Sequence, residues 1–404
     1  MSATIDNGVP ILDLRRAFKD IRGEVHAAVD RIFDTQAFIL GREVRTFEEH
    51  VEAYLDLPGS GAAIGCASGS DALLLALMAL DVKPGDEVIT TPYTFFATAS
   101  AVTRLGAVPV FADIDPVTYN VSLADVERKI TPKTKVFLPV HLFGQMVPLE
   151  EIAPLLKERG IKIVEDAAQA FGSWRRIGKE IVRAGTLGDV GCTSFFPTKN
   201  LGGCGDGGMM VTSDPELAAR LKKLRVHGEG QSPLPGGGSA YFHEEVGLNS
   251  RLDALQAAIL DVKLPHLEAW NEERRSLAAY YRLCFESRGL TGPRSGVPAE
   301  EGRITLPAEL EGNYHIYHQY VVRTPKRDEL MAWLEERGIS TRVYYPLPLH
   351  LQPCFAFLGG RPGDCPEAER LSREALALPI FPGLRAEEQE RLVDAVAEYV
   401  RTRF

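Results

Sequence analysis

Short apolar segments alternate with helical patterns between residues 60 and 215, and this alternation limits the folds open to the chain more than any other feature. Strands that are apolar on both faces and alternate with helices favour a mostly parallel sheet covered by helices. We therefore predict an α/β large domain built on such a sheet. The expected strands are 87–91, 108–112, 136–140 and 161–165, and the expected helices are 71–80, 97–105, 123–129 and 149–159.

The pattern changes after a Gly- and Pro-rich stretch at 228–241, which we expect to be a loop. We place a domain boundary near residue 265. This gives a large domain, 1–264, and a smaller C-terminal α+β domain, 265–404. Two domains suit a chain of 404 residues, because domains average about 150 residues. The later helices are expected at 252–262, 267–288, 327–337, 365–376 and 386–401, and strands at 314–323 and 340–345.

Composition excludes several classes of protein. No run reaches the about 18 apolar residues that a membrane helix needs, and a net charge of −10 argues against a general nucleic-acid surface. The six cysteines are scattered without a CxxC pair, so a disulfide framework is not expected. The first residues have no signal-peptide pattern. A cytoplasmic protein without membrane or nucleic-acid partners is predicted.

Polar residues follow the expected strands where a ligand would bind. In parallel sheets, ligands bind outside the carboxyl ends of the strands, and Asp166 ends a strongly apolar segment. Lys199 lies between Phe195-Phe196 and a glycine cluster, which suits a partly desolvated amine. A lysine and a carboxylate are what pyridoxal phosphate (PLP) requires, as a covalent anchor and as a partner of the pyridine nitrogen. The alternatives are a surface lysine and, for Asp166, a helix cap in a capping box.

The phosphate and the ring of PLP have further candidates. Gly69 and Ser70 open a helical pattern, so their amides and a hydroxyl can meet an anion. Ser194 would add a second hydroxyl, and Phe95 follows a strand end where it could stack on a ring. The alternatives are ordinary helix capping by Ser68 or Ser70 and a core position for Phe95.

The spacing of the residues excludes three other kinds of site: a dinucleotide-binding loop, a serine-hydrolase elbow and a histidine metal site. The cluster at 202–208 precedes a strand pattern rather than opening a helix, so it is not a dinucleotide fingerprint. No serine-hydrolase elbow is present. His315 and His318 fall in one expected strand, where they would point to opposite faces and could not share a metal. At most one of them is expected to face the site, and no metal site is predicted.

Several ordered motifs span nearly the whole chain. They are Phe38–Gly41, Phe47–Glu49, Ala67–Leu73, Thr91–Phe95, Pro139–Gly144, Glu165–Gln169, Ser194–Gly208, Asn249–Asp253, Gln256–Ala258, Tyr317–Tyr320, Tyr345–His350 and Leu378–Pro382. Together they resemble the PLP-dependent sugar aminotransferases of the DegT/DnrJ/EryC1/StrS family, of the aspartate-aminotransferase fold type I. Some members carry His in place of the lysine and act as dehydratases, whereas this chain has Lys199.

The resemblance implies a role for each matching residue. Lys199 would bond the cofactor and move protons, and Asp166 would pair with the pyridine nitrogen. Gln169 would contact the ring oxygen, and Asn249 would reach the phosphate of the neighbouring subunit's cofactor, which implies a homodimer. The other implied contacts are Gly69, Ser70, Asp71 (through its amide) and Ser194 to the phosphate, Phe95 to the ring, and Arg251, His318 and Tyr345 to the substrate.

The resemblance also implies the reaction. Transfer of an amino group from L-glutamate to a nucleotide-linked keto-sugar is expected, for amino-sugar biosynthesis. Gly205–Gly208 and Asn249–Asp253 look more like members that aminate C3 than like C4 members, and Arg342 is a further candidate for the substrate phosphates. The alternatives are a C4-keto-sugar, a keto-cyclitol or aminobenzoate precursor as acceptor, and a PLP-binding regulator without turnover.

Overall fold

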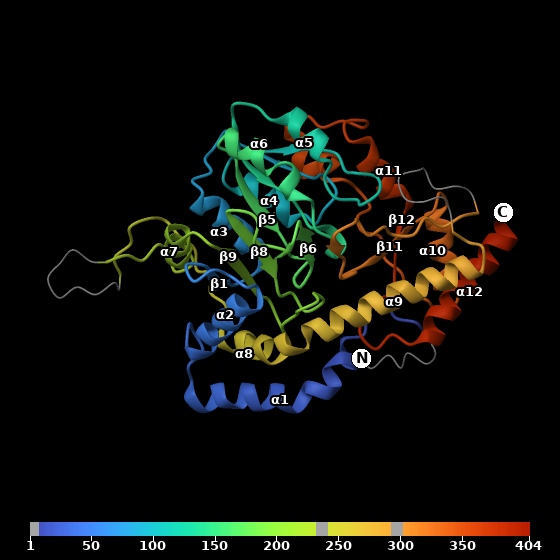
Figure 1. Ribbon diagram of the computed structural model, residues 1–404, viewed down its shortest axis with the longest axis horizontal. Helices are drawn as coiled ribbons and strands as arrows, with labels where there is room; N and C mark the ends of the chain where they lie inside the picture. The colour runs from blue at the N-terminus through green and yellow to red at the C-terminus, as the bar shows by residue number, and fades with distance from the viewer. Residues whose placement is uncertain (1–7, 232–240, 292–301) are drawn as a thin grey trace.

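Within the described part of the chain, the main sheet has seven strands and is parallel at every pairing except those of one strand. The computed structural model describes residues 8–231, 241–291 and 302–404. The strand order is β1-β9-β8-β5-β4-β2-β3, and β9 is antiparallel to both neighbours. The predicted α/β fold is confirmed (Figure 1). The strands are β1 (Ala62–Cys66), β2 (Glu87–Thr90), β3 (Val108–Phe111), β4 (Thr134–Leu138), β5 (Lys162–Asp166), β8 (Val190–Ser194) and β9 (Gly208–Thr212).

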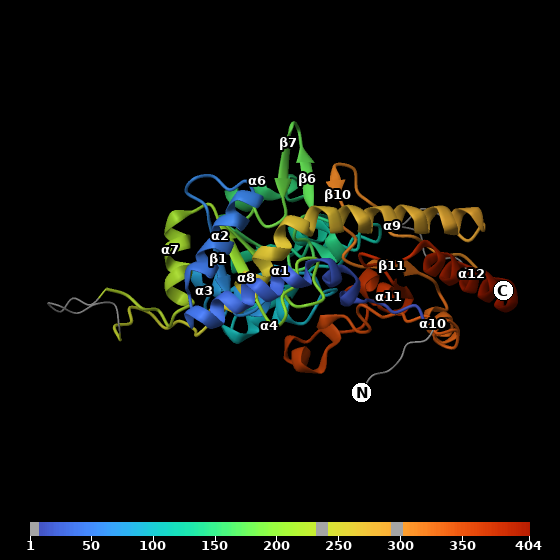
Figure 2. The same ribbon diagram turned by 90° about the horizontal axis from the view of Figure 1, so that it is seen from below.

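Neighbouring residues of these strands face opposite layers of helices, because side chains alternate along a strand. Val88 belongs to the cluster with α3, α4 and α7, whereas Ile89 packs with α5 and α6. In β9, Met210 likewise belongs to the cluster with α3, α4 and α7, whereas its neighbour Met209 packs with α2 and α8 on the other face. The sheet is therefore a buried middle layer (Figure 2). These helices are α2 (Arg42–Tyr54), α3 (Gly69–Ala79), α4 (Ala97–Arg104), α5 (Leu123–Lys129), α6 (Ala153–Glu158), α7 (Pro215–Leu224) and α8 (Ala254–Lys263), and α1 (Leu14–Thr35) packs on α8.

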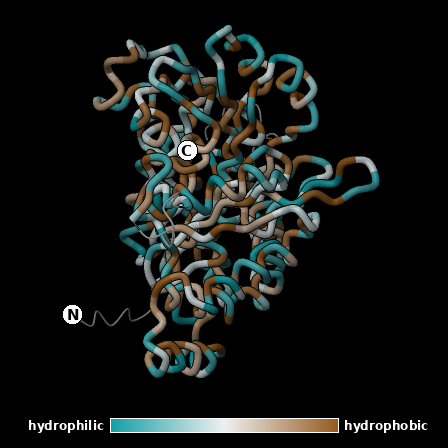
Figure 3. The backbone as a smooth tube through the Cα atoms, turned by 90° about the vertical axis from the view of Figure 1, so that its left-hand side faces the viewer, coloured by the Kyte–Doolittle hydropathy of each residue, from teal (hydrophilic) through white to brown (hydrophobic). Residues whose placement is uncertain are grey.

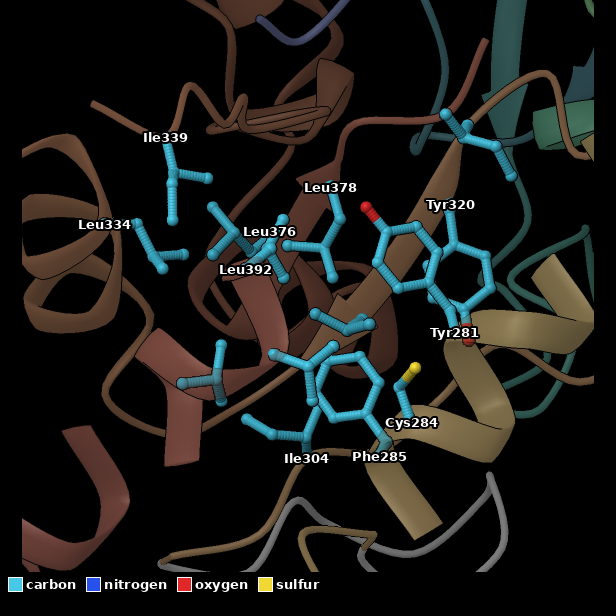
Figure 4. Close-up of a cluster of buried hydrophobic side chains, with 14 of the residues drawn as sticks. Tyr281, Cys284, Phe285, Ile304, Tyr320, Leu334, Ile339, Leu376, Leu378 and Leu392 are labelled. Carbon is cyan, nitrogen blue, oxygen red and sulfur yellow. The ribbon is translucent and has the colours of Figure 1, made fainter. Parts of the chain in front are cut away.

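The C-terminal part has its own apolar core, shown in Figure 4. Tyr281 and Phe285 of α9 pack with Tyr320 of β11, Leu376 of β12 and Leu392 of α12. The N-terminal Val9 joins the same cluster. Along the tube in Figure 3, apolar and polar stretches alternate, as expected for elements with one buried side. The remaining elements are β6 (Trp174–Ile177), β7 (Glu180–Arg183), β10 (Asn313–Tyr314), β11 (Tyr320–Arg323), β12 (Ala375–Leu378), α9 (Leu267–Ser287), α10 (Arg327–Glu335), α11 (Pro366–Glu374) and α12 (Ala386–Arg403).

Three predicted C-terminal elements are wrong in extent. The expected strand 314–323 is broken into β10 and β11, because Tyr317 has a φ of +42°, in the left-handed region that a strand does not allow. The expected strand 340–345 is reduced to one bridge between Arg342 and Ala377. The expected helix 365–376 ends at Glu374, where β12 begins.

The start of the segment expected as a loop pairs with the residues that directly follow its end. Gly230 N–H donates to Phe242 O at 2.9 Å, and Glu244 N–H donates to Gly228 O at 2.9 Å. The middle of that loop, 232–240, lies outside the described residues. Among the helices that are described, none is long and apolar enough to cross a membrane.

Candidate active site

Lys199 lies on the connection between β8 and β9. Phe195 anchors this segment in the core, where its ring packs edge-on against Phe47 at 5.4 Å. Lys199 N–H donates to Phe196 O at 2.9 Å, and Gly203 N–H donates to Phe195 O at 2.8 Å, so the backbone curls tightly around the lysine. Burial lowers the pKa of Lys199 to about 8, and the Asp166 carboxylate opposes this shift. Part of the population is thus a free amine near neutral pH, as a nucleophile requires.

Asp166 ends β5 and is 5% exposed. Its Oδ2 accepts from the Thr98 hydroxyl at 2.8 Å, and its Oδ1 accepts from Ala168 N–H at 3.2 Å. Burial raises the pKa of Asp166, while these two donors and the Lys199 charge act against the rise. The segment after Asp166 forms turns rather than a helix, and Gln169 bonds elsewhere, so the capping-box alternative is wrong.

Glu165, the residue before Asp166, forms a fully buried pair with the imidazole of His141. Glu165 Oε2 is 2.7 Å from His141 Nε2. His141 Nδ1 accepts from Val147 N–H at 3.1 Å, so Nε2 carries the proton that is donated to Glu165. Burial by itself would raise the pKa of Glu165. The hydrogen bond from His141 and those from the Gly188 and Gly185 amides outweigh burial and hold this pKa below its usual range. This pair, which sequence reasoning did not single out, fixes the strand that presents Asp166.

Gln169 is oriented by two hydrogen bonds. Its Oε1 accepts from Phe143 N–H at 2.8 Å, and its Nε2 donates to the Tyr345 hydroxyl at 3.0 Å. Tyr345 N–H in turn donates to the Tyr93 hydroxyl at 3.0 Å, and that hydroxyl donates to Tyr344 O. Because a side-chain amide has two N–H donors, Gln169 Nε2 retains one. Gln169 and Tyr345 are thus in contact with each other, a link that their sequence separation does not reveal.

The expected phosphate residues converge at the start of α3. A Cβ on Gly69 would lie 2.5 Å from Ser194 Cβ, so only glycine permits this approach. Ser68 Oγ accepts from Asp71 N–H at 3.1 Å, which leaves that amide less available to an anion than expected. Since the first amides of a helix have no partner within it, those of Gly69 and Ser70 are the stronger candidates. Ser70 is exposed, and Ser194 is half-buried.

The remaining predicted residues lie at or near the surface. Phe95 is 59% exposed, so its core alternative is wrong. Asn249 is exposed and Arg251 half-buried, and neither side chain makes a hydrogen bond within the described segments. Arg342 is likewise exposed, and its guanidinium has no acidic partner among the described residues.

One of the two candidate histidines lies beside the lysine. His318 Nδ1 donates to Asn200 Oδ1 at 2.9 Å, next to Lys199. Burial, followed by the charges of Lys199 and Arg274, lowers the pKa of His318 well below its usual value. His315 stacks on Tyr317 with ring centroids 4.0 Å apart, and burial lowers its pKa to about 3. That at most one histidine faces the site stays a prediction, and the reason given for it was wrong because 315–319 is not a strand.

This geometry defines a class of protein. An amine of lowered pKa and a buried carboxylate lie together at the carboxyl end of a parallel sheet, beside a helix start that suits a phosphate. A donor set of this kind fits PLP and is that of a PLP-dependent enzyme.

Comparison with known proteins agrees with this class. Residues 19–397 match the DegT/DnrJ/EryC1/StrS aminotransferase family, and the chain belongs to that family. It is 48% identical to a pleiotropic regulatory protein of Geobacillus stearothermophilus, over 97% of this chain and 99% of the relative. It is 41% identical to the UDP-N-acetyl-3-dehydro-alpha-D-glucosamine 3-aminotransferase of Acidithiobacillus ferrooxidans, over 97% and 98%. The crystal structure of S. venezuelae DesV in complex with a ketimine intermediate has a TM-score of 0.88, at 41% identity, covering 98% of this chain and 99% of DesV. The predicted family and enzyme class are confirmed.

Proposed function

We propose that the protein transfers an amino group from L-glutamate to the C3 ketone of a nucleotide-linked sugar, with PLP as its cofactor. The observation that carries this proposal is that the Lys199 amine, whose pKa is lowered by burial, lies within electrostatic range of the buried Asp166 carboxylate. The acceptor follows from the relatives. Besides the Acidithiobacillus enzyme, they include a dTDP-3-amino-3,4,6-trideoxy-alpha-D-glucose transaminase of Streptomyces venezuelae, at 42% identity, and a UDP-2-acetamido-2-deoxy-3-oxo-D-glucuronate aminotransferase of Pseudomonas aeruginosa, at 39%.

The residues present fit the cofactor. PLP supplies an electron sink. The amides of Gly69 and Ser70, with the Ser194 hydroxyl, would hold its phosphate. Asp166 would keep the pyridine nitrogen protonated. The free N–H of Gln169 Nε2 is suited to the ring oxygen, and Phe95 would cover one face of the ring.

Lys199 Nζ is the proton carrier of the proposed reaction. An amine with a pKa of about 8 can both release and accept a proton near neutral pH. It would remove the proton from the donor's α-carbon and later deliver one to the former ketone carbon of the sugar. His318, buried and uncharged beside it, adds no competing positive charge.

A homodimer with shared sites is part of the proposal. Asn249 is exposed, and Phe33, Ile39, Phe95 and Phe196 are 53%, 54%, 59% and 49% exposed. Large exposed apolar side chains are typical of surfaces that bind a partner. Asn249 of a second copy would contact the phosphate, and Arg251 the substrate. Mixing Lys199→Ala with Asn249→Asp protein tests this, because subunit exchange restores activity only if each site draws residues from both chains.

Domain limits and location complete the proposal. A C-terminal domain beginning near residue 265 is supported by the apolar cluster that α9, α10 and α12 form with β11 and β12, although Val9 also joins it. A cytoplasmic location is supported by six free cysteines, since reducing compartments keep thiols unpaired.

The regulator alternative is not favoured, even though the Geobacillus relative has a regulatory name. An amine that can both release and accept a proton near neutral pH favours turnover over cofactor binding alone. The deciding experiment is to add L-glutamate to the PLP-loaded protein and follow the cofactor absorbance. We expect a shift in wild type and none in Lys199→Ala; an unchanged wild-type spectrum would sink the proposal.

The acceptor needs its own experiment. The glutamate-treated enzyme, freed of excess donor, is mixed with 3-keto and 4-keto nucleotide sugars and with a keto-cyclitol. We expect the 3-keto-sugar to return the spectrum to its starting form fastest. A faster reaction with the 4-keto-sugar or the cyclitol would replace the C3 assignment.

A further inference from the structure

Arg274 is a buried cation without a carboxylate partner. It lies on α9, is 4% exposed, and pairs with no acid in the parts of the chain that are described. Its Nη1 donates to Ile380 O at 2.8 Å and, at 3.4 Å, to Tyr317 O and His318 O. Its Nε and Nη2 donate to no group within those same parts. The N–H groups of Nε and Nη2 are therefore available to bind an anion.

The protonation state of Arg274 supports this interpretation. Burial lowers the pKa of Arg274 to about 10, against the charge of Glu273. The group is therefore still charged at neutral pH. Burying a charge without a counter-charge is costly, so a bound anion would offset a penalty that the protein alone leaves standing.

Hydrogen bonds connect Arg274 to the lysine segment. Asn271, one turn earlier on α9, accepts from Asn200 Nδ2 at 2.6 Å. Asn200 adjoins Lys199 and also accepts from His318. The charges of Lys199 and Arg274 both lower the pKa of His318, after burial. Arg274 is thus near enough to Lys199 to share a neighbour with it.

Two cavities meet at Arg274. The first, of about 330 Å³, is lined by Lys199, Asn200 and Arg274, with apolar walls that include Phe18, Trp270 and Phe381. Among the described residues that line it, the one acid is Asp13, which is already paired with Arg15 at 2.8 Å. The second, of about 320 Å³, is lined by Arg274, His318 and Arg342, and none of the described residues that line it is acidic. Cationic groups thus outnumber acids around Arg274.

We propose that Arg274 binds a carboxylate of the amino donor, in the cavity that it shares with Lys199. This rests on the proposed transaminase function. A carboxylate and a phosphate would both suit the guanidinium, but a short carbon chain with an acidic end fits apolar walls and a volume at the small end of ligand pockets, about 300 Å³. A nucleoside diphosphate carries more charge and needs more polar surroundings.

Calorimetric titration of the PLP-loaded enzyme with glutarate tests the proposal. Glutarate has the two carboxylates of the donor but no amine or ketone, so it binds without reacting. We expect Arg274→Met to weaken glutarate binding at least about tenfold, as expected for the loss of a charge-assisted hydrogen bond. Arg274→Lys should give an intermediate affinity. The matched control is Arg282→Met, two turns along α9, where the arginine is 47% exposed and lies 3.9 Å from Glu286; it should bind as wild type does.

A second titration, with UDP, separates the two sources of anion. We expect Arg274→Met to leave UDP affinity unchanged. If Arg274→Met binds UDP more weakly but glutarate as tightly as wild type does, Arg274 is assigned to the sugar nucleotide and the carboxylate assignment is overturned. Equal glutarate affinity in wild type and variant, or no glutarate binding by wild type, would overturn it as well.

Thermal melting shows whether each variant is folded. If Arg274→Met does not fold, Arg274→Lys decides, and unchanged glutarate affinity in that variant counts against the proposal. The absorbance response of wild type to glutamate is read separately. A normal response with unchanged glutarate affinity in the variant sinks only the Arg274 assignment, whereas no response in wild type sinks the transaminase itself.

Discussion

Thr98 donates its hydroxyl proton to Asp166 Oδ2 across 2.8 Å inside the protein. Thr98 comes from the first turn of α4 and Asp166 from the end of β5, so the bond joins two elements that meet at one edge of the sheet. It stabilises the charged carboxylate against burial, which by itself raises the pKa of Asp166. A carboxylate that stays ionised is what a protonated pyridine nitrogen requires.

Replacing Thr98 with Val removes this donor and keeps the side-chain shape. We expect kcat/KM for glutamate to fall about tenfold or more, because a hydrogen bond to a charged group contributes about 1.5–3 kcal/mol. Steady-state kinetics measured from pH 6 to 9 check this, with a profile displaced to higher pH as Asp166 becomes harder to ionise. Thr98→Ser restores the hydroxyl and should recover most of the activity; equal losses in both variants would argue against the hydrogen bond.

The lowered pKa of Lys199 makes stability depend on pH. The native cofactor-free protein releases this proton near pH 8, whereas an unfolded lysine holds it to about pH 10.4. Between these values the unfolded state binds more protons, so stability rises with pH. Relative to Lys199→Met, the wild-type cofactor-free protein should therefore gain stability from pH 8 to 10. Urea unfolding of both proteins measures this, and a difference that does not vary with pH contradicts the lowered pKa.

Gly69→Ala should weaken PLP binding about tenfold or more. The new methyl would lie 2.5 Å from Ser194 Cβ, and forcing a tight contact apart typically costs about 1–3 kcal/mol. Fluorescence titration of the cofactor-free protein with PLP measures the effect. Gly23→Ala in α1 is the control, since nothing lies within 4 Å of its added methyl. PLP affinity equal to wild type in Gly69→Ala would show that the phosphate binds elsewhere.

Glu165→Gln should destabilise the fold by about 3 kcal/mol, as breaking a buried ion or hydrogen-bond pair does. Glu165 Oε1 accepts from Leu187 and Gly188 N–H at 2.7 and 2.6 Å, and an amide NH₂ turned toward those donors cannot accept. Denaturant midpoints check this, with the exposed Glu49→Gln as control. An unchanged midpoint would mean that the surrounding loop rearranges without cost.

Four strands of the large sheet, β2 to β5, were predictable because they carry an unambiguous apolar pattern. Val88 and Ile89, on opposite faces, are both fully buried, and such double burial leaves a continuous apolar run in the sequence. Lys199 and Asp166 were accessible for a related reason, since polar residues directly after such runs stand out.

The C-terminal part was less predictable because its backbone depends on contacts distant in sequence. Alternation near Tyr317 suggested a strand, but Ile316 N–H donates to Gly144 O at 3.1 Å, and Tyr317 adopts a left-handed conformation. Sequence alternation likewise could not show that, within 340–345, Arg342 alone pairs with β12. Thr98, Glu165 and Arg274 escaped notice because their partners lie far along the chain.

The place of β9 between β1 and β8 has a consequence for how the protein matures. Ser194 ends β8, Gly69 follows β1, and Gly208 at the start of β9 fits against the Ser68 backbone, with no room for a side chain. The two halves of the phosphate cradle therefore come together only when β9, the last strand of this sheet to be synthesised, inserts between two earlier ones. Long-range pairing of this kind forms slowly, so during biosynthesis the capture of PLP would mark the moment at which the sheet is complete.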